Sequence, residues 1–131
     1  MGGFFFDYNN DGLTDLLIVK AGCHRLFKNT GASFLDVSTE SNISTFCTYA
    51  SSASIFDYNN DGYLDIYISN SLNAGSDKID SGRKLGIIEP RRNKYRLDIY
   101  RQDILLKNID GKKFENVTKE LGIEENELTW A

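Results

Sequence analysis

The chain has 131 residues, 40% of them hydrophobic, and a formal net charge of −4. This length allows one domain with a real core, and the hydrophobic content excludes an acidic disordered tail. The mild charge gives no reason to expect nucleic acid as the main partner, and no apolar run approaches the roughly 20 residues of a membrane span. The opening residues lack the basic and apolar segments of a signal peptide.

The stretch FDYNNDG occurs twice, at residues 6–12 and again at residues 56–62. The two copies start 50 residues apart, within the period of about 20–50 residues that marks repeat proteins. The sequence therefore predicts two repeated units, which we place at residues 1–50 and 51–131.

An apolar segment follows each copy and has the properties of a β-strand. The second, LDIYIS (64–69), alternates apolar and polar residues, as a strand with one buried face does. The first, DLLIV (15–19), is apolar on both faces, which is expected for a strand covered on two sides.

Further strand-length segments match between the units. RLFKN (25–29) corresponds to ILLKN (104–108), and FLDVSTESNI (34–43) corresponds to FENVTKELGI (114–123). The dipeptide Asp110-Gly111 is a hairpin signal between two of these segments. We expect an all-β fold of about two four-stranded antiparallel blades of a β-propeller, a fragment of a larger one.

One short segment is a helix candidate: Thr118 could cap a helix that Gly122 ends. Two cysteines, Cys23 and Cys47, could form a disulfide or remain free buried thiols. The single histidine, His24, lies next to a predicted strand, which favours a structural role.

The second unit contains an insertion at about residues 71–101. The interval from Asp65 to Asn108 is 43 residues, against 14 from Asp15 to Asn29, so the second unit is 29 residues longer here. Residues 78–101 contain eight Lys or Arg and three Asp or Glu, a local charge of +5. Either this segment binds an acidic glycan or protein, or it is a solvated loop on one rim of the fold.

The repeated stretch carries side-chain oxygens at alternate positions. If the first Asp is position 1, these oxygens fall at positions 1, 3, 5 and 9, and the position 7 residue can offer its backbone carbonyl. The candidate ligands are Asp7, Asn9, Asp11, Leu13 and Asp15 in the first unit, and Asp57, Asn59, Asp61, Tyr63 and Asp65 in the second. Calcium takes 6–8 oxygen ligands, including backbone carbonyls, so this pattern predicts two calcium sites.

Electrostatics supports a metal over a plain turn. Carboxylates about 4 Å apart repel by roughly 4 kcal/mol per pair at an effective dielectric constant of 20, and a divalent cation offsets most of this. A turn rich in Asn, Asp and Gly without metal is the simplest alternative. An EF-hand fits less well, because its position 12 requires Glu and these loops have Ile18 and Ile68 there.

The stretches DYNNDGLTD and DYNNDGYLD resemble the calcium loops of FG-GAP/VCBS repeats, found in integrin alpha subunits and many secreted proteins. The downstream stretches RLFKNTGASFLDVSTESNI and ILLKNIDGKKFENVTKELGI resemble the VCBS branch, which includes cartilage acidic protein-like chains. This resemblance covers nearly the whole chain except the insertion. It implies a β-propeller, usually seven-bladed, with calcium in the hairpin between the first two strands of a blade.

The chain departs from the family pattern in having Asn at position 3 of each loop, where Asp is also common. This gives each loop a charge of −3 rather than −4 and is expected to weaken cation binding. The chain also stops at the phase of the repeat at which it starts, so we expect adjacent blades in a longer chain.

The resemblance implies a non-catalytic segment of an extracellular, secreted or cell-surface protein. Its role would be adhesion, ligand binding or scaffolding, with a protein or glycan as ligand. The alternative is a part of a calcium-dependent carbohydrate-active propeller enzyme such as a polysaccharide lyase. We expect no enzyme, because there is no G-x-S-x-G motif and no pair of histidines for a metal-bound water.

Overall fold

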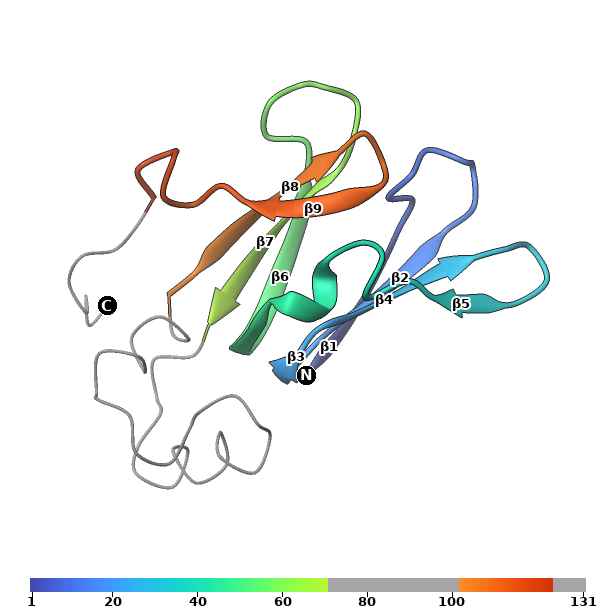
Figure 1. The fold of residues 1–131 in the computed structure, drawn as a ribbon, viewed down its shortest axis with the longest axis horizontal. Helices are drawn as coiled ribbons and strands as arrows, with labels where there is room; N and C mark the ends of the chain where they lie inside the picture. Colours follow the sequence, from blue (N-terminus) through green and yellow to red (C-terminus); the bar gives the residue numbers. More distant parts are fainter. Residues whose placement is uncertain (71–101, 124–131) are drawn as a thin grey trace.

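The computed structural model describes residues 1–70 and 102–123, and this part of the chain is all-β (Figure 1). It forms two antiparallel sheets, as expected, and contains no α-helix. No helix in the described residues is long and apolar enough to cross a membrane. The basic insertion at 71–101 and the C-terminal segment 124–131 lie outside the described residues.

The first sheet has four strands in the order β1-β2-β4-β5. Each strand runs antiparallel to its neighbour, and the β1–β2 pair places Phe6 opposite Asp15. The strands are β1 (Gly2–Phe6), β2 (Asp15–Val19), β4 (Arg25–Asn29) and β5 (Phe34–Asp36).

The second sheet has five strands rather than the four expected, in the order β3-β6-β7-β8-β9. They are β3 (Ala21–Cys23), β6 (Cys47–Phe56), β7 (Asp65–Asn70), β8 (Ile104–Ile109) and β9 (Lys113–Asn116).

The extra strand, β3, comes from the first unit. β6 lies between β3 and β7 in the sheet: β3 pairs with its first residues, Cys47 to Tyr49, and β7 pairs with it from Ala50 onward. The expected boundary between the units, after residue 50, falls inside β6.

The helix candidate that begins at Thr118 forms turns instead, so that prediction was wrong. The Thr118 hydroxyl accepts a hydrogen bond from the Leu105 N–H (2.9 Å) rather than capping a helix. Gly122 has φ +67°, which ends the segment after one turn. The corresponding residues 38–41 of the first unit also form turns, and a 3₁₀ turn, η1 (Ile43–Thr45), follows them. The hairpin predicted at Asp110-Gly111 is confirmed, since it joins β8 to β9.

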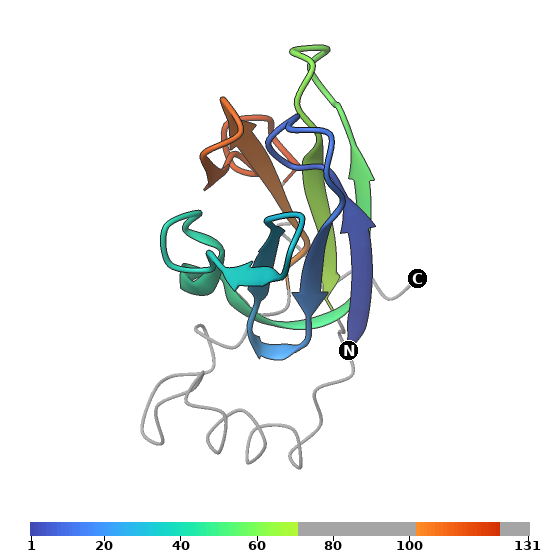
Figure 2. The same ribbon diagram turned by 90° about the vertical axis from the view of Figure 1, so that its right-hand side faces the viewer.

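The two units share one hydrophobic core. Its members are mainly aliphatic side chains of β2, β4, β7 and β8, with Phe114 of β9. Phe114 is fully buried, and its backbone N–H donates to the Ser41 carbonyl of the first unit (2.9 Å). The loops that follow β1 and β6 lie at the same end of the molecule (Figures 1 and 2).

The two ends of the insertion are held together where it leaves the sheet. Asp103 accepts hydrogen bonds from the Asn70 N–H (2.8 Å) and the Tyr67 hydroxyl (2.9 Å). The Asn70 side-chain amide donates to the Gln102 carbonyl. These bonds join the two ends of the insertion and close its neck.

Replacing residues 71–101 with a short Gly/Asn turn is therefore expected to preserve the fold. The melting temperature followed by circular dichroism should change by no more than a few degrees, because lengthening or shortening a closed loop costs little. Asp103→Ala in the shortened chain is the control and should lower the melting temperature, since it removes the closure of the neck. A shortened chain that fails to fold would show that the insertion supports the core.

Candidate metal centre

Three aspartates gather in each repeated loop. Asp7 follows β1, Asp11 lies in the turn, and Asp15 is the first residue of β2. Each of the three offers one carboxylate oxygen, and these oxygens all lie within 4.8 Å of one another. Asp57, Asp61 and Asp65 form an equal cluster in the second unit. The structure thus brings together all six carboxylates that the sequence selected.

The first aspartate organises the turn around itself. The Asp7 carboxylate accepts hydrogen bonds from the backbone N–H groups of Asp11 (3.3 Å) and Gly12 (2.8 Å). Gly12 has φ +82°, a conformation that glycine adopts without steric cost. The Asp57 carboxylate makes the equivalent bonds to Asp61 (3.2 Å) and Gly62 (2.9 Å). Each loop therefore has a fixed backbone that holds its carboxylates in place.

The last aspartate of each loop is fully buried and ties the loop to the sheet. Asp15 accepts hydrogen bonds from the N–H groups of Tyr8 (3.1 Å) and Asn29 (2.8 Å). Asp65 accepts the equivalent bonds from Tyr58 (3.1 Å) and Asn108 (2.8 Å). These donors come from the loop itself and from the strand that follows in the sheet.

Burial raises the pKa of Asp15 above its usual value, and the negative charges of Asp11 and Asp7 raise it further. The same causes raise the pKa of Asp65. Each buried carboxylate thus has unfavourable surroundings when it is charged. A bound cation would offset this cost.

The middle aspartate is exposed and remains readily ionised. The Leu13 N–H donates to the Asp11 carboxylate (2.9 Å), and this bond is the main cause that lowers the pKa of Asp11. The Tyr63 N–H has the same effect on Asp61. An ionised carboxylate at the mouth of each loop is suited to capturing a cation.

Asn9 supplies a test of whether a metal fits the first loop. Its side-chain amide donates to the Asp11 carboxylate (3.1 Å), while its side-chain oxygen is buried without a hydrogen-bond partner. An unsatisfied buried acceptor costs about 1–3 kcal/mol, and a hard cation would satisfy it. The residues present therefore fit the metal that the sequence predicts. The carbonyl ligands of Leu13 and Tyr63 remain predictions.

Asn108 is a part of the centre that the sequence analysis missed. Its side-chain amide donates to the carbonyls of Tyr8 (2.7 Å) and Leu64 (3.0 Å), which belong to different loops. The available signal was the asparagine that ends both RLFKN and ILLKN.

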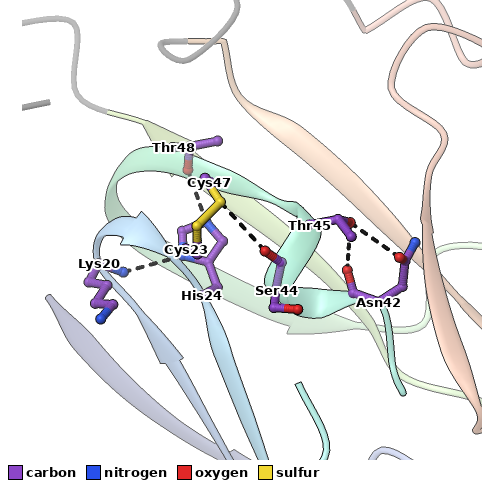
Figure 3. The surroundings of a disulfide bond; sticks show 8 residues. All are labelled: Lys20, Cys23, His24, Asn42, Ser44, Thr45, Cys47 and Thr48. Carbon is purple, nitrogen blue, oxygen red and sulfur yellow. Dashed lines mark hydrogen bonds between the residues drawn. A yellow bond between two sulfur atoms is a disulfide. The ribbon is translucent and has the colours of Figure 1, made fainter. Parts of the chain in front are cut away.

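A disulfide joins Cys23 of β3 to Cys47 of β6, so the two cysteines are not the free buried thiols that the sequence left as an alternative (Figure 3).

His24 is buried beside this disulfide and has a structural role, as expected. The Lys20 N–H donates to His24 Nδ1 (3.4 Å), and Nε2 lies 2.9 Å from the Thr48 hydroxyl. Burial, together with the charge of Lys20, lowers the pKa of His24 to about 4.

Comparison with known families identifies a repeat in this chain. Residues 7–68, from the first carboxylate loop into β7, match the model of the FG-GAP-like repeat. No curated protein and no solved structure shows significant similarity to the chain. The resemblance to FG-GAP repeats inferred from the two loops is thereby confirmed.

Proposed function

Because residues 7–68 match the model of the FG-GAP-like repeat, we propose that this chain is a calcium-binding, non-catalytic segment of an extracellular β-propeller. Its role would be adhesion, ligand binding or scaffolding. The observation that carries the proposal is the pair of equal carboxylate clusters, each with one fully buried aspartate.

The donor set favours calcium. All candidate ligands are oxygens: the carboxylates and asparagine amide oxygens of both loops, with the backbone carbonyls of Leu13 and Tyr63. Hard oxygen ligands select calcium or magnesium over zinc or copper. Five candidate ligand residues in each loop suit calcium better, because magnesium usually keeps several water ligands. When bound, the ion supplies positive charge that neutralises the cluster and cross-links its loop.

The carboxylates are engaged structurally, which supports a non-catalytic role. In both loops each of the three aspartates accepts hydrogen bonds from backbone N–H groups. The competing proposal is a part of a polysaccharide lyase. An assay of acidic polysaccharide cleavage with and without calcium separates the two, and calcium-dependent cleavage would favour the lyase.

The packing of the two units supports a propeller with adjacent blades. Phe114 of the second unit is fully buried because it packs against the first unit, whereas Phe34, its counterpart in the first unit, is 50% exposed. Leu35 beside it is 55% exposed. A preceding blade of a longer chain would cover these side chains in the way that the first unit covers Phe114.

The disulfide supports an extracellular, secreted or cell-surface location, since disulfides persist in oxidising compartments. We propose a protein or a glycan as the ligand, and no role in nucleic-acid binding, given the net charge of −4.

Calorimetric titration tests the metal. We expect two sites with dissociation constants of about 10⁻⁴–10⁻³ M, the range of extracellular modules. Asp61→Ala and Asp11→Ala should each remove one site. Calcium at ten times its dissociation constant should add about 1.4 kcal/mol of stability per site, which EDTA reverses.

Glu115→Ala removes an exposed carboxylate outside both loops and is the control, which should leave both sites intact. If the folded protein shows no heat of calcium binding up to tens of millimolar, the proposed function is wrong.

A further inference from the structure

The two loops share the sequence FDYNNDG but have different surroundings. Tyr8 of the first loop is 5% exposed and packs against Phe114, with ring centroids 6.3 Å apart, whereas Tyr58 is only partly buried. The Asn9 side-chain oxygen is buried, whereas Asn59 is exposed. Since the residues are identical, the difference must come from what lies next to each loop.

The neighbour of the first loop is the turn between β8 and β9 (residues 109–112), which belongs to the second unit (Figure 1). Gly111 of this turn lies directly against the loop backbone. A methyl group at Gly111 would come within 2.9 Å of Asn9 Cα and 2.9 Å of the Tyr63 ring. The turn is therefore in close contact with the position 3 residue of the first loop.

Asn108, in β8 immediately before this turn, is fully buried and holds the first loop. Its side-chain amide donates to the Tyr8 carbonyl (2.7 Å), and the N–H of Tyr8 in turn donates to Asp15 (3.1 Å). Its side-chain oxygen accepts from the Gly111 N–H (2.9 Å), which fixes the turn. Asn108 thus connects the second unit to the buried carboxylate of the first loop.

A second bond joins the loops directly. The side-chain amide of Asn10 donates to the Gly62 carbonyl (2.9 Å). Asn10 has φ +57° and its counterpart Asn60 has φ +56°, so the two positions have the same backbone conformation. Within the part of the chain that the structure describes, Asn60 makes no such bond to another loop.

The counterpart of Asn108 in the first unit is Asn29. Its side-chain oxygen accepts from the Gly31 N–H (2.8 Å), which is the same local arrangement. Within residues 1–70 and 102–123 its amide donates to no other loop, and a methyl group at Gly31 would meet only Leu13, at 3.9 Å. The repeat therefore supplies a matched control for each contact between the units.

We propose that the first cation site is completed by the second unit: Asn108 and the β8–β9 turn position its ligands before the cation binds. The first loop is then the tighter of the two sites. This inference rests on the proposed calcium binding. The expected difference is about tenfold in dissociation constant, the effect of ordering roughly one residue in advance.

Calcium titration of single-site variants tests the inference. In Asp61→Ala only the first loop can still bind calcium, and in Asp11→Ala only the second loop can. We expect the first loop to bind calcium about tenfold tighter than the second. Gly111→Ala added to Asp61→Ala should raise the calcium dissociation constant of the first loop to about that of the second. Gly31→Ala in the same background has a similar positive φ but no contact between units, and should change affinity by less than about twofold.

If the Gly111 variant does not fold, a second pair of variants tests whether the second unit tightens the first site. Asn10→Gly and Asn60→Gly suit their left-handed backbone equally, but only Asn10→Gly removes a bond between the loops. Asn10→Gly should weaken the first site, and Asn60→Gly should leave the first site unchanged. Equal affinities of the two loops, or equal effects of the two Gly variants, would overturn the inference. Absence of binding by either loop would instead overturn the proposed function.

Discussion

Removing the disulfide between Cys23 and Cys47 is expected to lower the free energy of unfolding by about 3 kcal/mol, because it closes a loop with a sequence separation of 24. The bond joins β3, which leaves the first sheet, to β6 of the second sheet. Its loss would release the connection between the two units as well as enlarging the conformational freedom of the unfolded chain.

Urea unfolding of the double variant Cys23→Ser/Cys47→Ser measures this effect. In a thermal melt of the same variant, the melting temperature should fall by roughly 10 °C or more. Reducing the disulfide of the unmodified chain should lower the melting temperature by a similar amount. Calcium binding should persist in the folded variant, since the disulfide lies at the end of the molecule away from both loops (Figures 1 and 2). Unchanged stability would mean that the β3–β6 pairing holds the units together without the covalent bond.

The sequence predicted the features that depend on neighbouring residues. The two carboxylate loops, the strands after them and the turn at Asp110-Gly111 follow from local spacing and turn chemistry, and the structure places all of these as expected. The six aspartates converge because each loop folds around its own first carboxylate.

Features that depend on the arrangement of the two units were not predictable in this way. Nothing in Ala21–Cys23 shows that it joins the sheet of the other unit, because only the fold brings the start of β6 beside it. The role of Asn108 likewise depends on a loop 100 residues earlier in the chain. The segment at Thr118 has a helical pattern, but its hydroxyl finds a partner in the sheet.

Lowering the pH should destabilise the protein through His24. The ring is fully buried and neutral: Nδ1 accepts a hydrogen bond from the Lys20 N–H, which leaves Nε2–H to donate to the Thr48 hydroxyl. Adding a proton at Nδ1 would break the Lys20 bond and bury a charge. Burial, with a further contribution from Lys20, accordingly lowers the pKa of His24 from 6.5 to about 4 in the folded state.

The direction of the effect follows from proton linkage. Between about pH 6.5 and pH 4 the unfolded chain binds a proton that the folded chain does not, so stability is lost as the pH falls through this window. The loss should reach about 2 kcal/mol at pH 5 and about 3 kcal/mol at pH 4. Because His24 is the only histidine, its single imidazole signal in NMR spectra reports the folded-state pKa directly.

His24→Gln is the matched variant, since its amide can still donate to Thr48 but does not titrate. Urea unfolding of both proteins in EDTA, from pH 7 to pH 4, isolates the histidine because the carboxylates of the two loops are present in both. Those carboxylates include Asp15 and Asp65, whose raised pKa values act in the opposite direction as the pH falls. The stability of the histidine protein should therefore decline relative to the glutamine variant, by about 3 kcal/mol at pH 4. Parallel curves for the two proteins would show that the buried ring gains its proton without cost.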